Sequence, residues 1–180
     1  MKFNVFHIVG DHWATLKNVD GEASYIDFAI LYVLPAVIAS VAFLDVWPKD
    51  NSIYGVSISV FAIFSALLLN VQIAIFGIFQ RKWRSTGDKV KDEKAKRKYI
   101  SRKILLSQLN TNISYLIIIS CLSVTVFLVF YVYPINSFSE RYISVYVYVH
   151  FLLTLMMVIK RTHVLFQNEY SVDEGMLGSS

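Results

Sequence analysis

The sequence predicts an all-α integral membrane protein: a bundle of four transmembrane helices with both termini in the cytoplasm and a basic helical extension between helices two and three. Three observations support this fold class. Hydrophobic residues make up 56% of the 180 residues, and the mean hydropathy is +0.52. Four apolar runs are each close to the ~20 residues that a membrane span needs. Finally, residues 80–103 hold eleven of the seventeen Lys and Arg residues.

The four expected spans lie at about residues 28–47, 53–79, 104–133 and 142–159. The fourth contains "ISVYVYVHF", which alternates like a β-strand. An isolated strand would leave backbone groups unpaired in hydrocarbon, so we predict a helix there. Around this transmembrane domain (26–166) we expect a cytoplasmic segment at 1–25, lying on the membrane surface or against the bundle. A tail follows at 167–180, and its last residues partly resemble a cloning remnant.

Charge predicts the orientation. Positive residues stay on the cytoplasmic side of a membrane, so the basic loop 80–103 and both termini are expected inside, in a bacterial inner membrane. The residues expected to anchor this topology are Arg81, Lys82 and Arg84.

The basic segment allows several further roles. Orientation alone explains its charge, and contact with anionic lipid follows from it. A partner protein could also dock there, most favourably on Lys94, Arg97 and Lys98, because a helix would present them together. Direct nucleic-acid binding is disfavoured, because the segment contains no nucleic-acid-binding motif.

Polar residues of all four helices are expected at one depth, near the inner leaflet boundary, by the ~1.5 Å rise per residue. They could form a layer that joins the helices, gates them or receives a partner, or they could be ordinary interfacial residues. Asp27 could pair with Arg161 or Lys160. The predicted layer comprises Asp27, Asn70, Gln72, Asn112, Ser114, Lys160, Arg161 and His163.

Two further residues and one group of residues have alternative roles. Pro35 removes the hydrogen bond to the Leu31 carbonyl, which predicts a kink that is either a hinge or a tolerated proline. His150 lies in mid-span and is either a proton sensor or a hydrogen-bonded packing residue. His7, Asp11 and His12 could bind a metal together with His163, but their spacing matches no metal motif, so no metal is predicted.

Enzymatic function is not predicted. The sequence has no glycine-rich phosphate loop, nucleophile motif or intramembrane acidic pair, and no cofactor is expected. A proton-coupled transporter is disfavoured too, because none of the four span cores contains an acid. These observations leave a small bundle that senses, gates or recruits, and any pore would lie between subunits.

Three stretches, "FLLTLMMVIKRTHVLFQNEY", "LLLNVQIAIFGIFQRKW" and "RKYISRKILLSQLNTNISY", resemble those of small four-span membrane proteins of prokaryotic antiphage defence, in particular the membrane subunits of Kiwa systems. The resemblance covers most of the chain in layout. It implies an inner-membrane homo-oligomer, with a tetramer as the first expectation, that senses infection together with a cytoplasmic partner. The alternatives are a pore-forming abortive-infection effector and a small channel.

Overall fold

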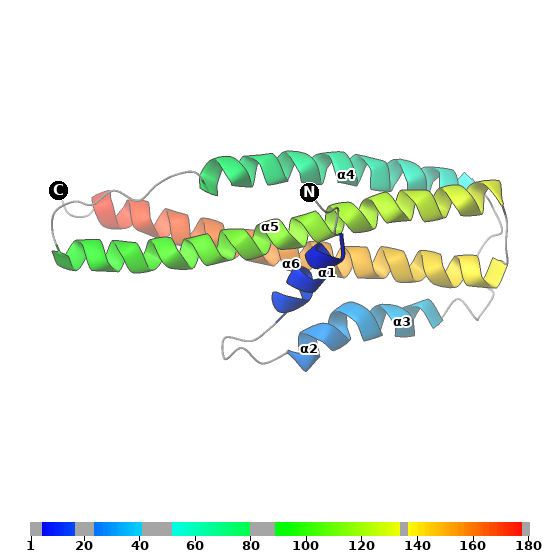
Figure 1. The fold of residues 1–180 in the computed structure, drawn as a ribbon, viewed down its shortest axis with the longest axis horizontal. Helices are drawn as coiled ribbons and strands as arrows, with labels where there is room; N and C mark the ends of the chain where they lie inside the picture. The colour runs from blue at the N-terminus through cyan, green and yellow to red at the C-terminus, as the bar shows by residue number, and fades with distance from the viewer. Residues whose placement is uncertain (1–4, 17–23, 41–51, 80–88, 134–136, 178–180) are drawn as a thin grey trace.

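The computed structural model describes residues 5–16, 24–40, 52–79, 89–133 and 137–177 (Figure 1). Every secondary-structure element in these ranges is helical, which confirms the all-α prediction. The fourth apolar run is also helical, so its strand-like alternation is overridden. The elements are α1 (Val5–Ala14), α2 (Tyr25–Phe28), the π-helical segment η1 (Ala29–Val33), α3 (Leu34–Ala39), α4 (Ser52–Phe79), α5 (Lys89–Val132) and α6 (Ser137–Leu177).

Helices α4, α5 and α6 run along the length of the molecule, with α5 antiparallel to both α4 and α6 (Figure 1). Each contains a stretch long and apolar enough to cross a membrane. Many of their large apolar side chains are exposed on the outside of the bundle, as lipid contact requires. The chain is therefore an all-α protein of the membrane type.

Aromatic rings fill the space between these three helices. Phe61 of α4, Phe127 of α5 and Phe151 of α6 are all buried. The Phe61 ring centroid lies 5.6 Å from that of Phe127 and 5.1 Å from that of Phe151. These separations are typical of favourable ring pairs. The centre of the bundle at this level is a packed core.

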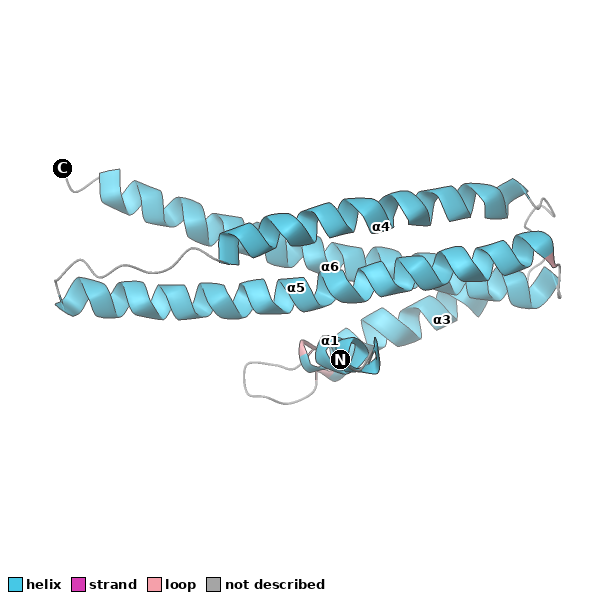
Figure 2. Cartoon of the chain, turned by 45° about the horizontal axis from the view of Figure 1, so that its top comes forward, coloured by secondary structure: helices cyan, strands magenta, loops and turns pink. Residues whose placement is uncertain are grey.

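The described part of the first expected span is shorter than its counterparts. Helices α2 and α3 and the η1 segment between them form one apolar helix, Tyr25–Ala39, below the length of a full span. At ~1.5 Å per residue its fifteen residues cover roughly 22 Å. Its α3 part packs against α6, and Figure 2 shows the two side by side. Residues 41–47, the second half of the expected span, lie outside the described residues.

Helix α1 packs against α5, which is one of the two placements expected for the N-terminal segment. It also reaches η1, because Trp13 Nε1 donates a 2.7 Å hydrogen bond to the Tyr32 hydroxyl. Helix α1 thus lies between α5 and the apolar helix Tyr25–Ala39.

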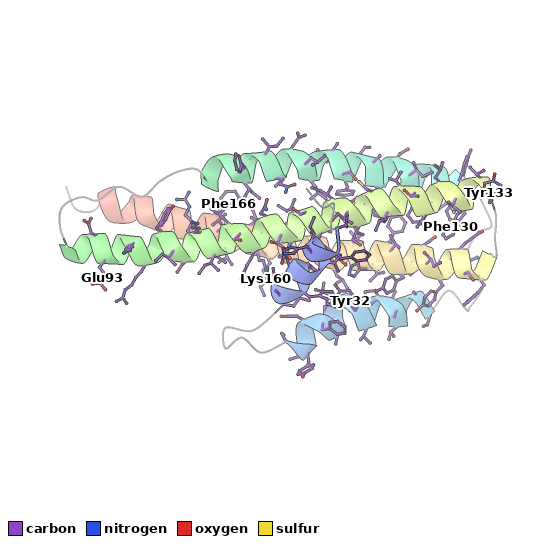
Figure 3. All side chains as sticks on the ribbon, in the orientation of Figure 1. Tyr32, Glu93, Phe130, Tyr133, Lys160 and Phe166 are labelled. Carbon is purple, nitrogen blue, oxygen red and sulfur yellow. The ribbon has the colours of Figure 1, made fainter. Side chains whose placement is uncertain are left out.

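Helix α5 joins the basic segment and the third span in one continuous helix of 44 residues. Figure 1 shows α5 and α6 both running beyond the end of α4, and Figure 3 places Glu93 on this projection, at the opposite end of the molecule from Tyr133. Arg97 Nη2 donates to Glu93 Oε1 at 2.7 Å within the projection. The expected topology anchors Arg81, Lys82 and Arg84 lie outside the described residues.

Candidate functional site

The candidate site begins at Pro35, which has no backbone N–H and so leaves the Leu31 carbonyl without its usual helical partner. A buried unpaired carbonyl is costly, and in a membrane no water replaces the lost donor. His150 of α6 supplies it, with Nδ1 2.8 Å from the Leu31 oxygen. The helix also widens into η1 immediately before the proline. The carbonyl that Pro35 frees is therefore used to join α6 to the apolar helix Tyr25–Ala39.

This bond fixes the tautomer of His150. A carbonyl oxygen can only accept, so Nδ1 carries the proton and Nε2 of the neutral ring accepts. The Tyr115 hydroxyl lies 2.8 Å from Nε2 and donates to it. His150 and Tyr115 are both buried, and the bond joins α5 to α6. His150 thus matches the description of a hydrogen-bonded packing residue.

Tyr115 supports α1 on its ring face. The His12 ring stacks on it with a centroid distance of 3.9 Å and an interplanar angle of 2°. His12 Nδ1 lies 2.8 Å from Asn112 Oδ1, one helical turn before Tyr115. Because an amide oxygen accepts, Nδ1 of His12 is the donor, and Nε2 is left with a free lone pair. The aromatic stack and the hydrogen bond together hold the centre of α1 on α5.

Thr15 and Arg161 complete the contact. The single hydroxyl proton of Thr15 has two acceptors within reach, the His12 carbonyl at 2.7 Å and Asn112 Oδ1 at 2.9 Å. Arg161 Nη2 of α6 donates to the Thr15 carbonyl at 2.8 Å. This carbonyl ends α1, where a positive charge is favoured by the helix dipole. Helix α1 is thereby bound to α6 as well as to α5.

We call these groups the α1 network. It connects α1, η1, α5 and α6 through side chains that are mostly buried. The network consists of His12, Thr15, the Leu31 carbonyl, Asn112, Tyr115, His150 and Arg161.

The network is not fully satisfied. Three of its buried polar atoms have no hydrogen-bond partner: His12 Nε2, Asn112 Nδ2 and Arg161 Nη1. Leaving a buried polar group unpaired costs about 1–3 kcal/mol. The docked position of α1 therefore includes an energetic penalty at its centre.

His12 is neutral in this environment. Burial lowers its pKa from 6.5 to about 4; the hydrogen bond to Asn112 acts in the opposite direction, while the charges of His150 and Arg161 add to the lowering. Helix α1 lies outside the three helices that are long and apolar enough to span a membrane.

A second polar contact joins α4 to α5. Gln72 Nε2 donates to Ser114 Oγ at 2.9 Å and to Asn110 Oδ1 at 3.2 Å. Interhelical bonds of this kind are expected for amides in membrane helices. Of the predicted polar layer, the structure therefore brings Gln72 and Ser114 together, while Asn112 and Arg161 belong to the α1 network.

The remaining members of the predicted layer are exposed and lie apart from these contacts: Asp27, Asn70, Lys160 and His163. Asp27 makes no salt bridge with Arg161 or Lys160 in the described part of the chain, contrary to the expected pair. Its backbone N–H is instead capped by Ser24 Oγ at 3.3 Å. Asp27 is close enough to act on Arg161 electrostatically, but the guanidinium donates instead to the Thr15 carbonyl, at 2.8 Å.

The histidines of α1 do not converge. His7 pairs with Asp11 at 2.8 Å on the exposed side of the helix, while His12 points into the bundle. Among the described residues, no group of three His, Cys, Asp or Glu side chains is placed to hold a metal ion.

Sequence reasoning missed Tyr115 and Thr15 as members of the site. Tyr115 reads as one more aromatic residue of an apolar span, and Thr15 follows α1 without any motif. The available signal was His12, a polar side chain on a face that Val5, Ile8 and Leu16 make largely apolar.

No protein-family model matches the chain, and neither the curated proteins nor the solved structures that were compared with it give a match.

A double-mutant cycle tests the substitution of His150 for the missing proline N–H. His150→Leu leaves the Leu31 carbonyl and the Tyr115 hydroxyl unpaired and should cost roughly 2–4 kcal/mol of unfolding free energy in detergent. Pro35→Ala restores a donor, so His150→Leu should cost about 1 kcal/mol less in that background. The exposed His163→Leu serves as the control. Equal costs in both backgrounds would contradict the interpretation.

The α4–α5 bond can be tested separately. Gln72→Leu removes the donor to Ser114 and should lower the stability of helix association by about 0.6–2 kcal/mol, measured by thermal unfolding in detergent. Ser59→Ala is a matched control, because Ser59 is exposed and its Oγ bonds only to the Gly55 carbonyl of its own helix. Asn70→Leu should behave like the control. A loss with Asn70→Leu as large as with Gln72→Leu would show that the interhelical bond is not the cause.

Proposed function

We propose that this protein is an oligomeric scaffold and sensor of a bacterial inner membrane that acts with a cytoplasmic partner in antiphage defence. The observation that carries the partner role is the projection of α5 and α6 beyond α4 (Figure 1). This projection bears the basic cluster of the chain on one continuous helix. The antiphage context comes from the resemblance of the three stretches to small four-span defence proteins.

The membrane arrangement of the proposal has four spans, with both termini and the basic segment in the cytoplasm. Its support is the charge asymmetry of the sequence. The three long apolar helices supply the second, third and fourth spans, and Tyr25–Ala39 begins the first.

The packed centre of the bundle supports a scaffold over a channel within one subunit. Phe61, Phe127 and Phe151 occupy the space between α4, α5 and α6. A pore-forming effector would therefore need a pathway between subunits. Depolarisation of cells on overexpression, without a partner, would favour that effector over the scaffold.

Reporter fusions test the proposed orientation. Fusions within the basic segment, for example after Lys91, and at both termini should give a cytoplasmic signal, because eleven basic residues resist translocation. A fusion in the short loop at 134–136 should give a periplasmic signal. A periplasmic signal after Lys91 would overturn the arrangement.

The partner-binding role of the basic face can be tested by removing charge from one side of the helix and then from the other. Lys94, Arg97 and Lys98 changed together to Gln should preserve insertion but weaken recovery of the cytoplasmic partner several-fold. The remaining complex should be lost as salt rises, because such contacts are screened over roughly 8–10 Å. Defence activity should fall in parallel.

A charge-matched control lies on another side of the same helix. At the ~3.6 residues per turn of an α-helix, Lys89, Lys96 and Lys103 share one side, turned away from the first group. Their change to Gln removes the same charge and should leave partner recovery and activity close to wild type. Equal effects of the two triple variants would mean that only the amount of charge matters, as for a topology signal.

A further inference from the structure

The contact between α1 and the bundle is built differently from the rest of the fold. Helix α1 has ten residues, which is below the ~12–15 residues that an isolated helix needs even for marginal stability in water. Its helical state therefore depends on docking. At the centre of the contact, however, lies His12, a fully buried polar side chain.

Undocking would relieve the unpaired atoms at this contact. His12 Nε2 lies on α1, while Asn112 Nδ2 and Arg161 Nη1 lie on the two helices that α1 covers. All three gain hydrogen bonds to water or lipid headgroups when α1 leaves. These unpaired atoms therefore lower the stability of the docked state relative to the undocked one.

A proton on His12 is a further penalty. On α5 the His12 ring faces Tyr115, which is stacked against it. On α6 it faces the Arg161 guanidinium, whose positive charge opposes a second one. On α1 itself, the Asp11 carboxylate is turned outward and paired with His7. No carboxylate of the described residues therefore compensates a charged His12.

We propose that α1 is a proton-released cover: when His12 takes up a proton, α1 leaves α5 and α6 and uncovers Asn112, Tyr115 and Arg161. This inference does not depend on the proposed role in defence.

The direction of the effect follows from linkage. The pKa of His12 is about 4 in the docked state and 6.5 for a solvated ring. A lowered pKa means that docking favours the neutral ring, so docking is fully stable above pH 6.5 and weakens as the pH falls toward 4. Between pH 7.5 and 5.5 the undocking equilibrium should rise about tenfold.

Hydrogen exchange of the full chain in nanodiscs measures this equilibrium directly. Amide protection factors, corrected for the intrinsic rate at each pH, are compared for residues 5–16 and for the core of α5 around residues 113–130. In the wild type, protection of α1 should fall about tenfold from pH 7.5 to 5.5 while α5 stays protected. H12Q should show no pH dependence. H7Q, a matched change on the exposed side of the same helix, should retain the fall.

Loss of α5 protection in H12Q would reveal that this variant does not fold. A second variant, R161Q, then tests the proposal independently. R161Q removes a positive charge facing His12, so the protection of α1 should fall less with pH than in the wild type. The proposal is overturned if wild-type protection of α1 does not change with pH. It is equally overturned if α5 loses protection together with α1, or if H12Q or R161Q shows the full wild-type fall.

Discussion

The contacts that hold α1 on the bundle depend on one backbone group that lacks a donor within its own helix, the Leu31 carbonyl. In a bilayer, water does not replace a missing helical donor, so a proline in a membrane helix must be matched by a donor from elsewhere. His150 is that donor. Because its Nδ1 is thereby committed, its Nε2 must accept, which orients the Tyr115 hydroxyl and presents the Tyr115 ring to His12. A backbone constraint in the apolar helix Tyr25–Ala39 thus helps to determine where α1 can bind.

The two sides of the bundle are held by different forces. Lipid tails are as apolar as leucine, so helices in a membrane gain little from burying apolar surface and associate through close packing and hydrogen bonds. Between α4, α5 and α6 close packing dominates, with interlocked Phe61, Phe127 and Phe151. On the α1 side hydrogen bonds dominate, and their strength depends on protonation and on available partners. The first kind of contact changes little with conditions, and the second responds to them.

The sequence predicted an all-α chain with long apolar helices, because apolar length is a property of single segments. The strand-like "ISVYVYVHF" was resolved correctly by bilayer physics, and the freed Leu31 carbonyl followed from Pro35 alone. The partner of that carbonyl could not be predicted, since it depends on which face of α6 meets the first helix. For the same reason the Asp27 pairing failed: equal depth of Asp27 and Arg161 says nothing about rotation, and the guanidinium reaches the end of α1 instead. Contacts between segments require the helix rotations that a hydropathy pattern leaves open.

Helix α5 links the two regions to which functions are assigned. The basic projection and the residues that receive α1, Asn112 and Tyr115, belong to one uninterrupted helix. From Arg97 to Asn112 the helix rises roughly 22 Å at ~1.5 Å per residue. A ligand of the projection can shift α1 only if it binds the docked and undocked states with different affinity, and the coupling is then reciprocal. Any such difference must pass through a tilt or rotation of α5, because His12 is stacked directly on it. The α1 contact, with its unpaired polar atoms, is the part of this assembly that offers two alternative states for a rotation of α5 to select.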